Sequence, residues 1–168
     1  MAKQGLADLN TYRHLVAADR DRVAESQVLH ALQMAGEKIA KALLYGLDPQ
    51  YRVGGDGERK LSHVSLSRLV DTLGSKRKLA AALQMSESKF EGCLGSFGPW
   101  YRQIERLQPQ LAGDGPNVEY PWQNGGTWVA PCEHRFGLLA QLLNGEGLKS
   151  LRFLERLARA VPALVTAS

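Results

Sequence analysis

The sequence has few cysteines, and their positions provide no covalent or metal-binding framework. Cys93 and Cys132 are the only two in 168 residues, and their separation fits neither a zinc-type spacing nor a disulfide scaffold. A disulfide-stabilised secreted domain is therefore not expected. We expect a reduced, cytoplasmic protein that carries no metal and no other cofactor.

Long apolar runs are also missing. The first ten residues, MAKQGLADLN, contain a lysine without an apolar stretch behind it, so they do not resemble a signal peptide. No segment approaches the roughly 20 apolar residues that a membrane-spanning helix needs. We therefore expect no contact with the membrane interior.

The overall composition is that of one globular domain over residues 1–168. The hydrophobic fraction of 44% and the charged fraction of 23% are ordinary for a folded chain of this length. The formal net charge of +4 is mildly basic. It permits contact with nucleic acid but does not by itself indicate it.

Strand patterns are scarce, and a helical period dominates the chain. Between residues 23 and 47, two apolar rows follow the three-and-four spacing of a helix. The rows are Val28, Leu32, Ala35, Ile39 and Leu43, and Leu29, Gly36, Ala40, Leu44 and Leu47. Apolar residues on so wide a face predict a helix with neighbours on more than one side.

Other segments repeat this period over shorter lengths, which predicts an all-α, up-and-down bundle of four to five helices. We expect glycines and Pro99 to interrupt the helix that begins near Ser86, and a new helix to run from Pro99 to Leu111. The remaining helices are expected at residues 6–19, 65–73, 76–85, 136–143 and 147–161.

Residues 113–135 lack a helical period and contain three prolines. The turn sequence NGG between Trp122 and Trp128 predicts a small hairpin. A non-helical stretch of this length is usually a functional loop or disordered. The aromatic residues within it indicate that it is ordered and packed.

One glycine lies in the densest apolar part of the long helix. Gly36 costs about 1 kcal/mol in helix propensity relative to Ala. Its place among Leu29, Ala40 and Leu44 predicts that another helix crosses closely there, either within the bundle or across a dimer. We expect the charged residues Glu37 and Lys41 to lie at the edges of the apolar rows.

The same helix carries a string that resembles the long helix of HEPN domains. The matching residues are Gln33, Gly36, Glu37, Lys38, Lys41, Ala42, Leu43 and Leu44. The later segment His63 to Leu69 is similar to the His-x-x-x-Leu-x-x-Leu element of that family, and NVEYPW is similar to its Tyr-Pro element. The resemblance covers roughly residues 8–160.

The resemblance implies a helical bundle that forms a homodimer. It also implies a bacterial setting: toxin–antitoxin pairs, phage defence, or partners of small nucleotidyltransferases. Many HEPN members are metal-independent ribonucleases with an Arg followed after four to six residues by a His. In that pair the Arg would stabilise the developing phosphorane charge while the His moves a proton.

This sequence departs from the ribonuclease motif. The chain has only four histidines, and the nearest approach to the motif is Arg59 with His63, which are separated by three residues. Arg135 lies in the expected late region, but no histidine follows it. We therefore expect a non-catalytic member that binds a nucleotide, RNA or a protein partner. An atypical ribonuclease using Arg59 and His63 and a purely structural interaction module are the alternatives.

Two groups of residues are candidates for contact with a ligand or partner. Four basic residues form a stripe on the last helix: Lys149, Arg152, Arg156 and Arg159. The stripe would bind the phosphates of a nucleic acid, or it is simply the solvent-exposed face of an amphipathic helix. The second group would stack a base, contact a partner or, for the loop aromatics, anchor the loop: His63, Tyr120, Trp122, Trp128, His134 and Arg135. Cys132 with His134 as metal ligands or as a nucleophilic pair is a less favoured reading, because no third group is apparent.

Overall fold

The computed structural model describes residues 2–18, 22–47 and 76–166, and within them the chain is an all-α bundle with one small hairpin. The expected helix at 65–73, together with Arg59 and His63, lies outside the described residues. The described helices are α1 (Ala2–Ala17), α2 (Glu25–Leu47), α4 (Lys76–Ala82), α5 (Glu87–Glu105), α6 (Pro109–Ala112), α7 (Gly137–Leu142) and α8 (Gly145–Thr166). The strands are β1 (Trp122–Asn124) and β2 (Thr127–Val129), and a short 3-10 turn, η2, covers Pro131–Glu133.

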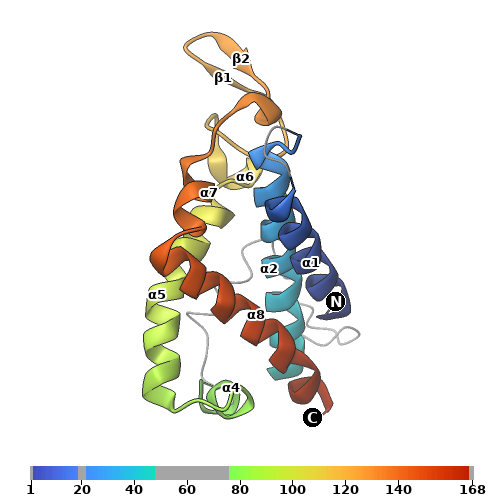
Figure 1. Cartoon of the computed structure of the whole chain (residues 1–168), viewed down its shortest axis with the longest axis vertical. Helices are drawn as coiled ribbons and strands as arrows, with labels where there is room; N and C mark the ends of the chain where they lie inside the picture. The colour runs from blue at the N-terminus through green and yellow to red at the C-terminus, as the bar shows by residue number, and fades with distance from the viewer. Residues whose placement is uncertain (1, 19–21, 48–75, 167–168) are drawn as a thin grey trace, which may run out of the picture.

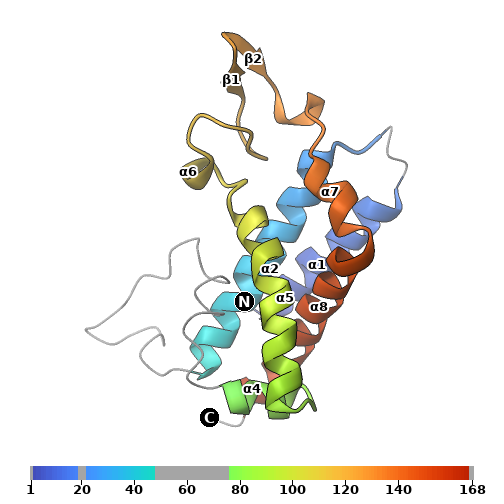
Figure 2. The same cartoon turned by 90° about the vertical axis from the view of Figure 1, so that its left-hand side faces the viewer.

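Helix α2 is the centre of the bundle. It contacts α1, α5 and α8, and α8 crosses obliquely over the front of the molecule (Figures 1 and 2). The predicted rows explain this position, because every described side chain in both rows is buried. The wide apolar face is thus covered within a single chain.

The space beside Gly36 is filled by a side chain from another helix, and not by the backbone of a closely crossing helix as expected. A Cβ atom at this position would overlap the hydroxyl and ring carbons of Tyr101, which belongs to α5. The Tyr101 hydroxyl donates a hydrogen bond to the backbone carbonyl of Gln33, at 3.3 Å. The glycine therefore makes room for an aromatic ring that joins α2 to α5.

The expected interruption of α5 is wrong. The helix runs unbroken from Glu87 to Glu105 with Pro99 inside it. Pro99 and Gly95 both lie on the exposed side, where solvent can reach a helix backbone that lacks one N–H donor. The opposite side packs into the core and keeps the segment helical: Phe90, Leu94, Phe97, Tyr101 and Ile104.

The expected continuation of this helix to Leu111 is also wrong. Helix α5 ends at Glu105, and α6 is a separate turn that begins at Pro109. A proline restrains the residue before it to extended backbone, and Gln108 has ψ 140°. Leu111 is consequently 43% exposed instead of facing the core.

The predicted hairpin is present. Strand β1 pairs with β2 in antiparallel register, with Asn124 opposite Thr127. The two connecting residues, Gly125 and Gly126, have φ values of 56° and 85°. Positive φ at both positions is what a type I′ turn requires, and glycine adopts it without strain.

The described helices can be compared with what a lipid bilayer requires. None of them is both long and apolar enough to cross one.

Candidate functional site

One buried tryptophan holds together the two ends of the loop between α6 and α7. Trp122 is 6% exposed. Its ring packs edge-on against His134, with centroids 5.0 Å apart, and tilts against Phe136 at 6.4 Å. His134 and Phe136 also pack against each other, at 4.6 Å. Trp122 and His134 thus serve as structural anchors, which is one of the two roles considered for the loop aromatics.

Backbone contacts hold the start of this loop. Asn117 is buried, and its side-chain oxygen accepts hydrogen bonds from the backbone N–H of Glu119 and of Tyr120, at 3.0 and 2.7 Å. The N–H of Val118 donates to the carbonyl of Leu107 at 3.1 Å. An Asn side chain that binds the backbone two residues later is a local turn device, so this segment has one defined conformation.

Glu25 ties the end of the loop to α2. One of its carboxylate oxygens accepts a hydrogen bond from the N–H of Phe136 at 2.6 Å, and the other pairs with Arg135 at 3.3 Å. Phe136 is the N-cap of α7, so the carboxylate binds a donor at the start of that helix. The loop is therefore attached at both ends.

Two aromatic side chains remain outside this anchored core. Tyr120 is 60% exposed and Trp128 is 67% exposed. The hairpin that carries Trp128 projects beyond the ends of the helices (Figures 1 and 2). The structure therefore divides the predicted loop residues into buried anchors and exposed aromatics, a division that the sequence did not specify.

The hairpin end is slightly acidic and polar. Between residues 113 and 135 there are three acidic residues, Asp114, Glu119 and Glu133, against one basic residue, Arg135. A polar cavity of about 300 Å³ lies below the hairpin, between the start of α2 and the segment that contains Cys132 and His134. Among residues 2–18, 22–47 and 76–166, no group of three or more His, Cys, Asp or Glu could hold a metal ion.

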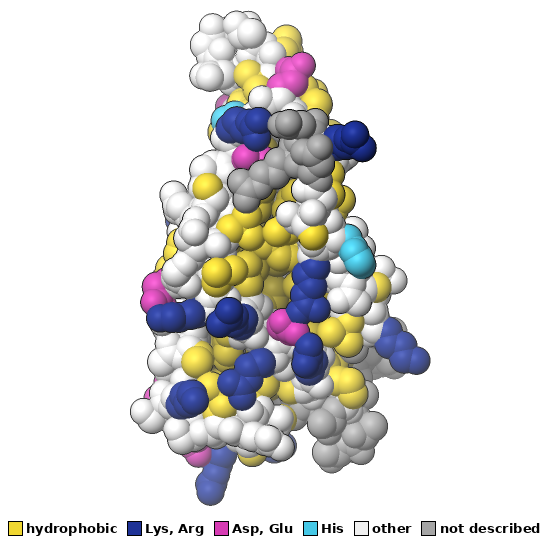
Figure 3. Space-filling view, in the orientation of Figure 1, with side chains coloured by type: hydrophobic (Ala, Val, Ile, Leu, Met, Phe, Trp, Pro, Cys, Tyr) yellow, Lys and Arg dark blue, Asp and Glu magenta, His cyan; other side chains and the backbone are white. Residues whose placement is uncertain are grey.

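The basic stripe on α8 is largely engaged in contacts within the chain. Lys149 pairs with Glu146, and Arg159 pairs with Glu155. Arg156 donates to the backbone carbonyl of Leu83 at 2.8 Å. Arg152, in contrast, has no ion pair with the described part of the chain. Figure 3 shows Lys and Arg side chains gathered over the lower half of this face.

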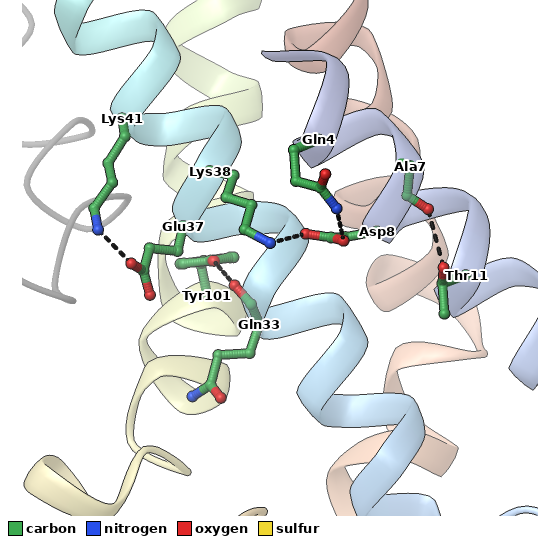
Figure 4. Close-up of polar contacts among 9 residues, drawn as sticks. All are labelled: Gln4, Ala7, Asp8, Thr11, Gln33, Glu37, Lys38, Lys41 and Tyr101. Carbon is green, nitrogen blue, oxygen red and sulfur yellow. Dashed lines mark hydrogen bonds and ion pairs between the residues drawn. The ribbon is translucent and has the colours of Figure 1, made fainter. Parts of the chain in front are cut away.

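A buried polar cluster between α2 and α5 was missed by the sequence reasoning. Glu37 is 6% exposed and Glu105 is 3% exposed, so Glu37 does not lie at an edge as expected. The ion pair of Glu37 with Lys41 is present, and Figure 4 shows Glu37 beside Tyr101. Burial first, then the carboxylates of Glu105 and Glu37, raise the pKa of Tyr101 well above 10.

This cluster joins helices. The side-chain amide of Gln33 donates to the carbonyl of Ile104 at 3.2 Å, next to the Tyr101 bond. Gln33 and Tyr101 therefore link α2 with the C-terminal part of α5. The sequence does contain a signal for this cluster, which is a spacing of four residues. It places Gln33 with Glu37 on one face of α2, and Tyr101 with Glu105 on one face of α5.

Comparisons of the chain with known protein families, with characterised proteins and with solved structures give no match.

Proposed function

We propose that the chain is a non-catalytic, HEPN-like binding module, and that its hairpin end contacts a protein partner. The observation that carries this proposal is the exposure of Trp128 and Tyr120 beside a rigidly anchored loop. Large aromatic side chains supply much of the binding energy of protein interfaces, and they do so best when the surface that presents them is already ordered.

Charge favours a protein over a nucleic acid at this end. The acidic residues of the loop, Asp114, Glu119 and Glu133, outnumber its one basic residue, Arg135, and would repel phosphates. Stacking of a base on Trp128 would thus lack the positive charge that normally accompanies it. In the bacterial setting that the resemblance implies, a nucleotidyltransferase-type protein is one such partner.

Binding of RNA or a nucleotide is the second candidate, through the basic stripe. Ion pairs on a surface are weak, so phosphates could compete for Lys149 and Arg159. Such binding would weaken steeply with salt and would be lost when the four stripe residues are changed to Gln. Salt-dependent RNA binding that disappears in this variant would favour the nucleic-acid function over the protein partner.

The ribonuclease alternative depends on Arg59 and His63, which lie outside the described residues. We expect the purified protein to leave RNA intact in the presence of a chelator. RNA degradation that stops in a His63→Ala variant would instead establish the atypical enzyme.

A homodimer remains part of the proposal, on the strength of the resemblance alone. The two-sided apolar face of α2, which a dimer would also cover, is already covered by α1, α5 and α8 within one chain. Solution scattering at tens of micromolar should give twice the chain mass of 18.5 kDa. A monodisperse monomer would remove the dimer and leave the partner proposal standing.

The partner proposal is tested by co-expression with the product of a neighbouring gene and purification after nuclease treatment. We expect a stoichiometric complex that is lost in the double variant Tyr120→Ala, Trp128→Ala. Leu111→Ala is the matched control, because it removes an exposed apolar side chain outside the hairpin and should leave the complex intact. A complex that survives the double variant would contradict the assignment of the hairpin end.

A further inference from the structure

A second candidate site lies on another face, where α1 meets the junction of α7 and α8. A groove of about 210 Å³ opens there between the helices. Its walls are mainly apolar: Leu9, Val16, Leu143, Leu148 and Leu151. Figure 3 shows apolar side chains following a hollow on this face, with Lys and Arg side chains below them.

Basic groups dominate the rim of the groove. Glu155 pairs with both Arg13 and Arg159. The hydrogen bond from Arg13, the largest cause, lowers the pKa of Glu155, so this carboxylate stays charged and occupied. Arg152 also lines the groove, and no described residue neutralises it. One guanidinium is therefore left for an incoming anionic group.

Tyr12 adds to the lining of the groove. It is 4% exposed, and its oxygen makes no hydrogen bond within residues 2–18, 22–47 and 76–166. The oxygen itself is closed to solvent, so it is not available as a donor to an occupant, and Tyr12 contributes only to the lining of the groove. The groove thus offers an apolar wall and a cation.

We propose that this groove binds the C-terminal residue of a protein partner, with an apolar side chain between α1 and α8 and its carboxylate at Arg152. Capture of a terminal carboxylate next to a side-chain pocket is a recurrent mode of peptide recognition. An Arg binds a carboxylate through paired, charge-assisted hydrogen bonds, which a Lys or a neutral donor does not reproduce.

Size and charge together select this occupant. Pockets that enclose a drug-sized ligand usually measure about 300–1,000 Å³, whereas this groove is smaller and suits one apolar side chain. A terminal residue carries its apolar group and its charge on the same Cα. The two can therefore reach the wall of the groove and Arg152 at the same time.

The groove is a different surface from the hairpin, and the two proposals fail separately. Tyr120→Ala with Trp128→Ala tests the hairpin without touching the groove. Arg152→Gln tests the groove without touching the hairpin. Only the general premise that the chain binds proteins is shared.

The experiment is a titration of the ¹⁵N-labelled full chain with acetyl-Gly-Ser-Gly-Leu, either as the free acid or as the C-terminal amide. We expect the acid to shift the resonances of residues around Leu9 and Leu151 with millimolar affinity. The amide should bind about tenfold more weakly, because it lacks the charge that Arg152 binds.

The matched control for Arg152→Gln is Arg77→Gln, which removes the same charge from an exposed position on α4. We expect acid binding to fall about tenfold in Arg152→Gln and to stay unchanged in Arg77→Gln. Equal affinity for acid and amide, or full binding by Arg152→Gln, would overturn the proposal. Binding of octanoate without binding of the peptide acid would also overturn it, since the occupant would then be a free apolar acid.

Discussion

Gly36 is the residue at which the central helix makes room for an aromatic ring from α5. The Tyr101 ring occupies the space that a side chain at this position would need, and its hydroxyl binds the carbonyl of Gln33. Gln33, Gly36 and Glu37 also belong to the string that resembles HEPN domains. In this chain those residues pack and link helices, a role that requires no chemistry.

The Gly36→Ala variant tests this packing. Although Ala improves helix propensity by about 1 kcal/mol, overlap with the buried Tyr101 ring should lower the free energy of unfolding by about 2–3 kcal/mol. Urea unfolding measures the difference.

Gly92→Ala is the control, because Gly92 belongs to α5 and a Cβ atom added there would have no neighbouring atom within 4 Å. It should gain up to about 1 kcal/mol from helix propensity alone. If both variants gave the same change, the close approach at Gly36 would not contribute to stability.

The elements differ in how far the sequence predicts them. Helix α2 and the hairpin follow from an apolar period and from the NGG turn, because both signals are local. The continuity of α5 through Pro99 does not follow from a local signal. It depends on the burial of the core face of α5, which outweighs the backbone hydrogen bond that is lost at Pro99. Likewise, nothing local distinguishes the buried Trp122 from the exposed Trp128, because the difference arises from contact with His134 and Phe136.

The variant Glu25→Ala tests how the loop is attached to α2. In Glu25→Ala, the N–H of Phe136 and the guanidinium of Arg135 lose their acceptor. We expect stability to fall by about 1–2 kcal/mol. Hydrogen exchange should become faster in α7 and in the hairpin, while the α2–α5 contact keeps its protection.

Glu87→Ala is the matched control, because Glu87 is also an acidic residue in the first turn of a helix. Its pair with Arg77 is exposed on both sides and should contribute at most about 1 kcal/mol. If Glu87→Ala loosened the loop as much as Glu25→Ala, the carboxylate of Glu25 would not be its anchor.

At the scale of the whole molecule, polar groups are distributed unevenly. The hairpin end bears exposed aromatics, and the α8 face is basic (Figure 3). The interface between α2 and α5 contains buried carboxylates beside a phenol. Two phenols are buried in total among the described residues, Tyr12 at 4% and Tyr101 at 1% exposure. Their protonation therefore couples the stability of the whole bundle to alkaline pH.

Burial raises the pKa of Tyr12 to about 12, and that of Tyr101 lies well above 10. Both phenols are protonated in the folded and unfolded states below pH 10, so their contribution to stability is complete there. Above pH 10 the unfolded state loses these protons first. Stability should then fall by about 1.4 kcal/mol per pH unit for each tyrosine, and for Tyr12 this fall ends near pH 12.

Denaturant unfolding between pH 9 and pH 11.5 should show this fall in the wild-type chain and a shallower one in Tyr12→Phe with Tyr101→Phe. Comparing slopes removes the background from lysines, which titrate equally in both chains. Tyr120→Phe supplies the control, because it removes a phenol that is 60% exposed. An equal slope in the double variant and the wild type would mean that neither buried phenol is linked to folding. Any loss of folding stability at high pH would then have to come from the ion pairs, such as the pair of Lys38 with Asp8 that joins α2 to α1 (Figure 4).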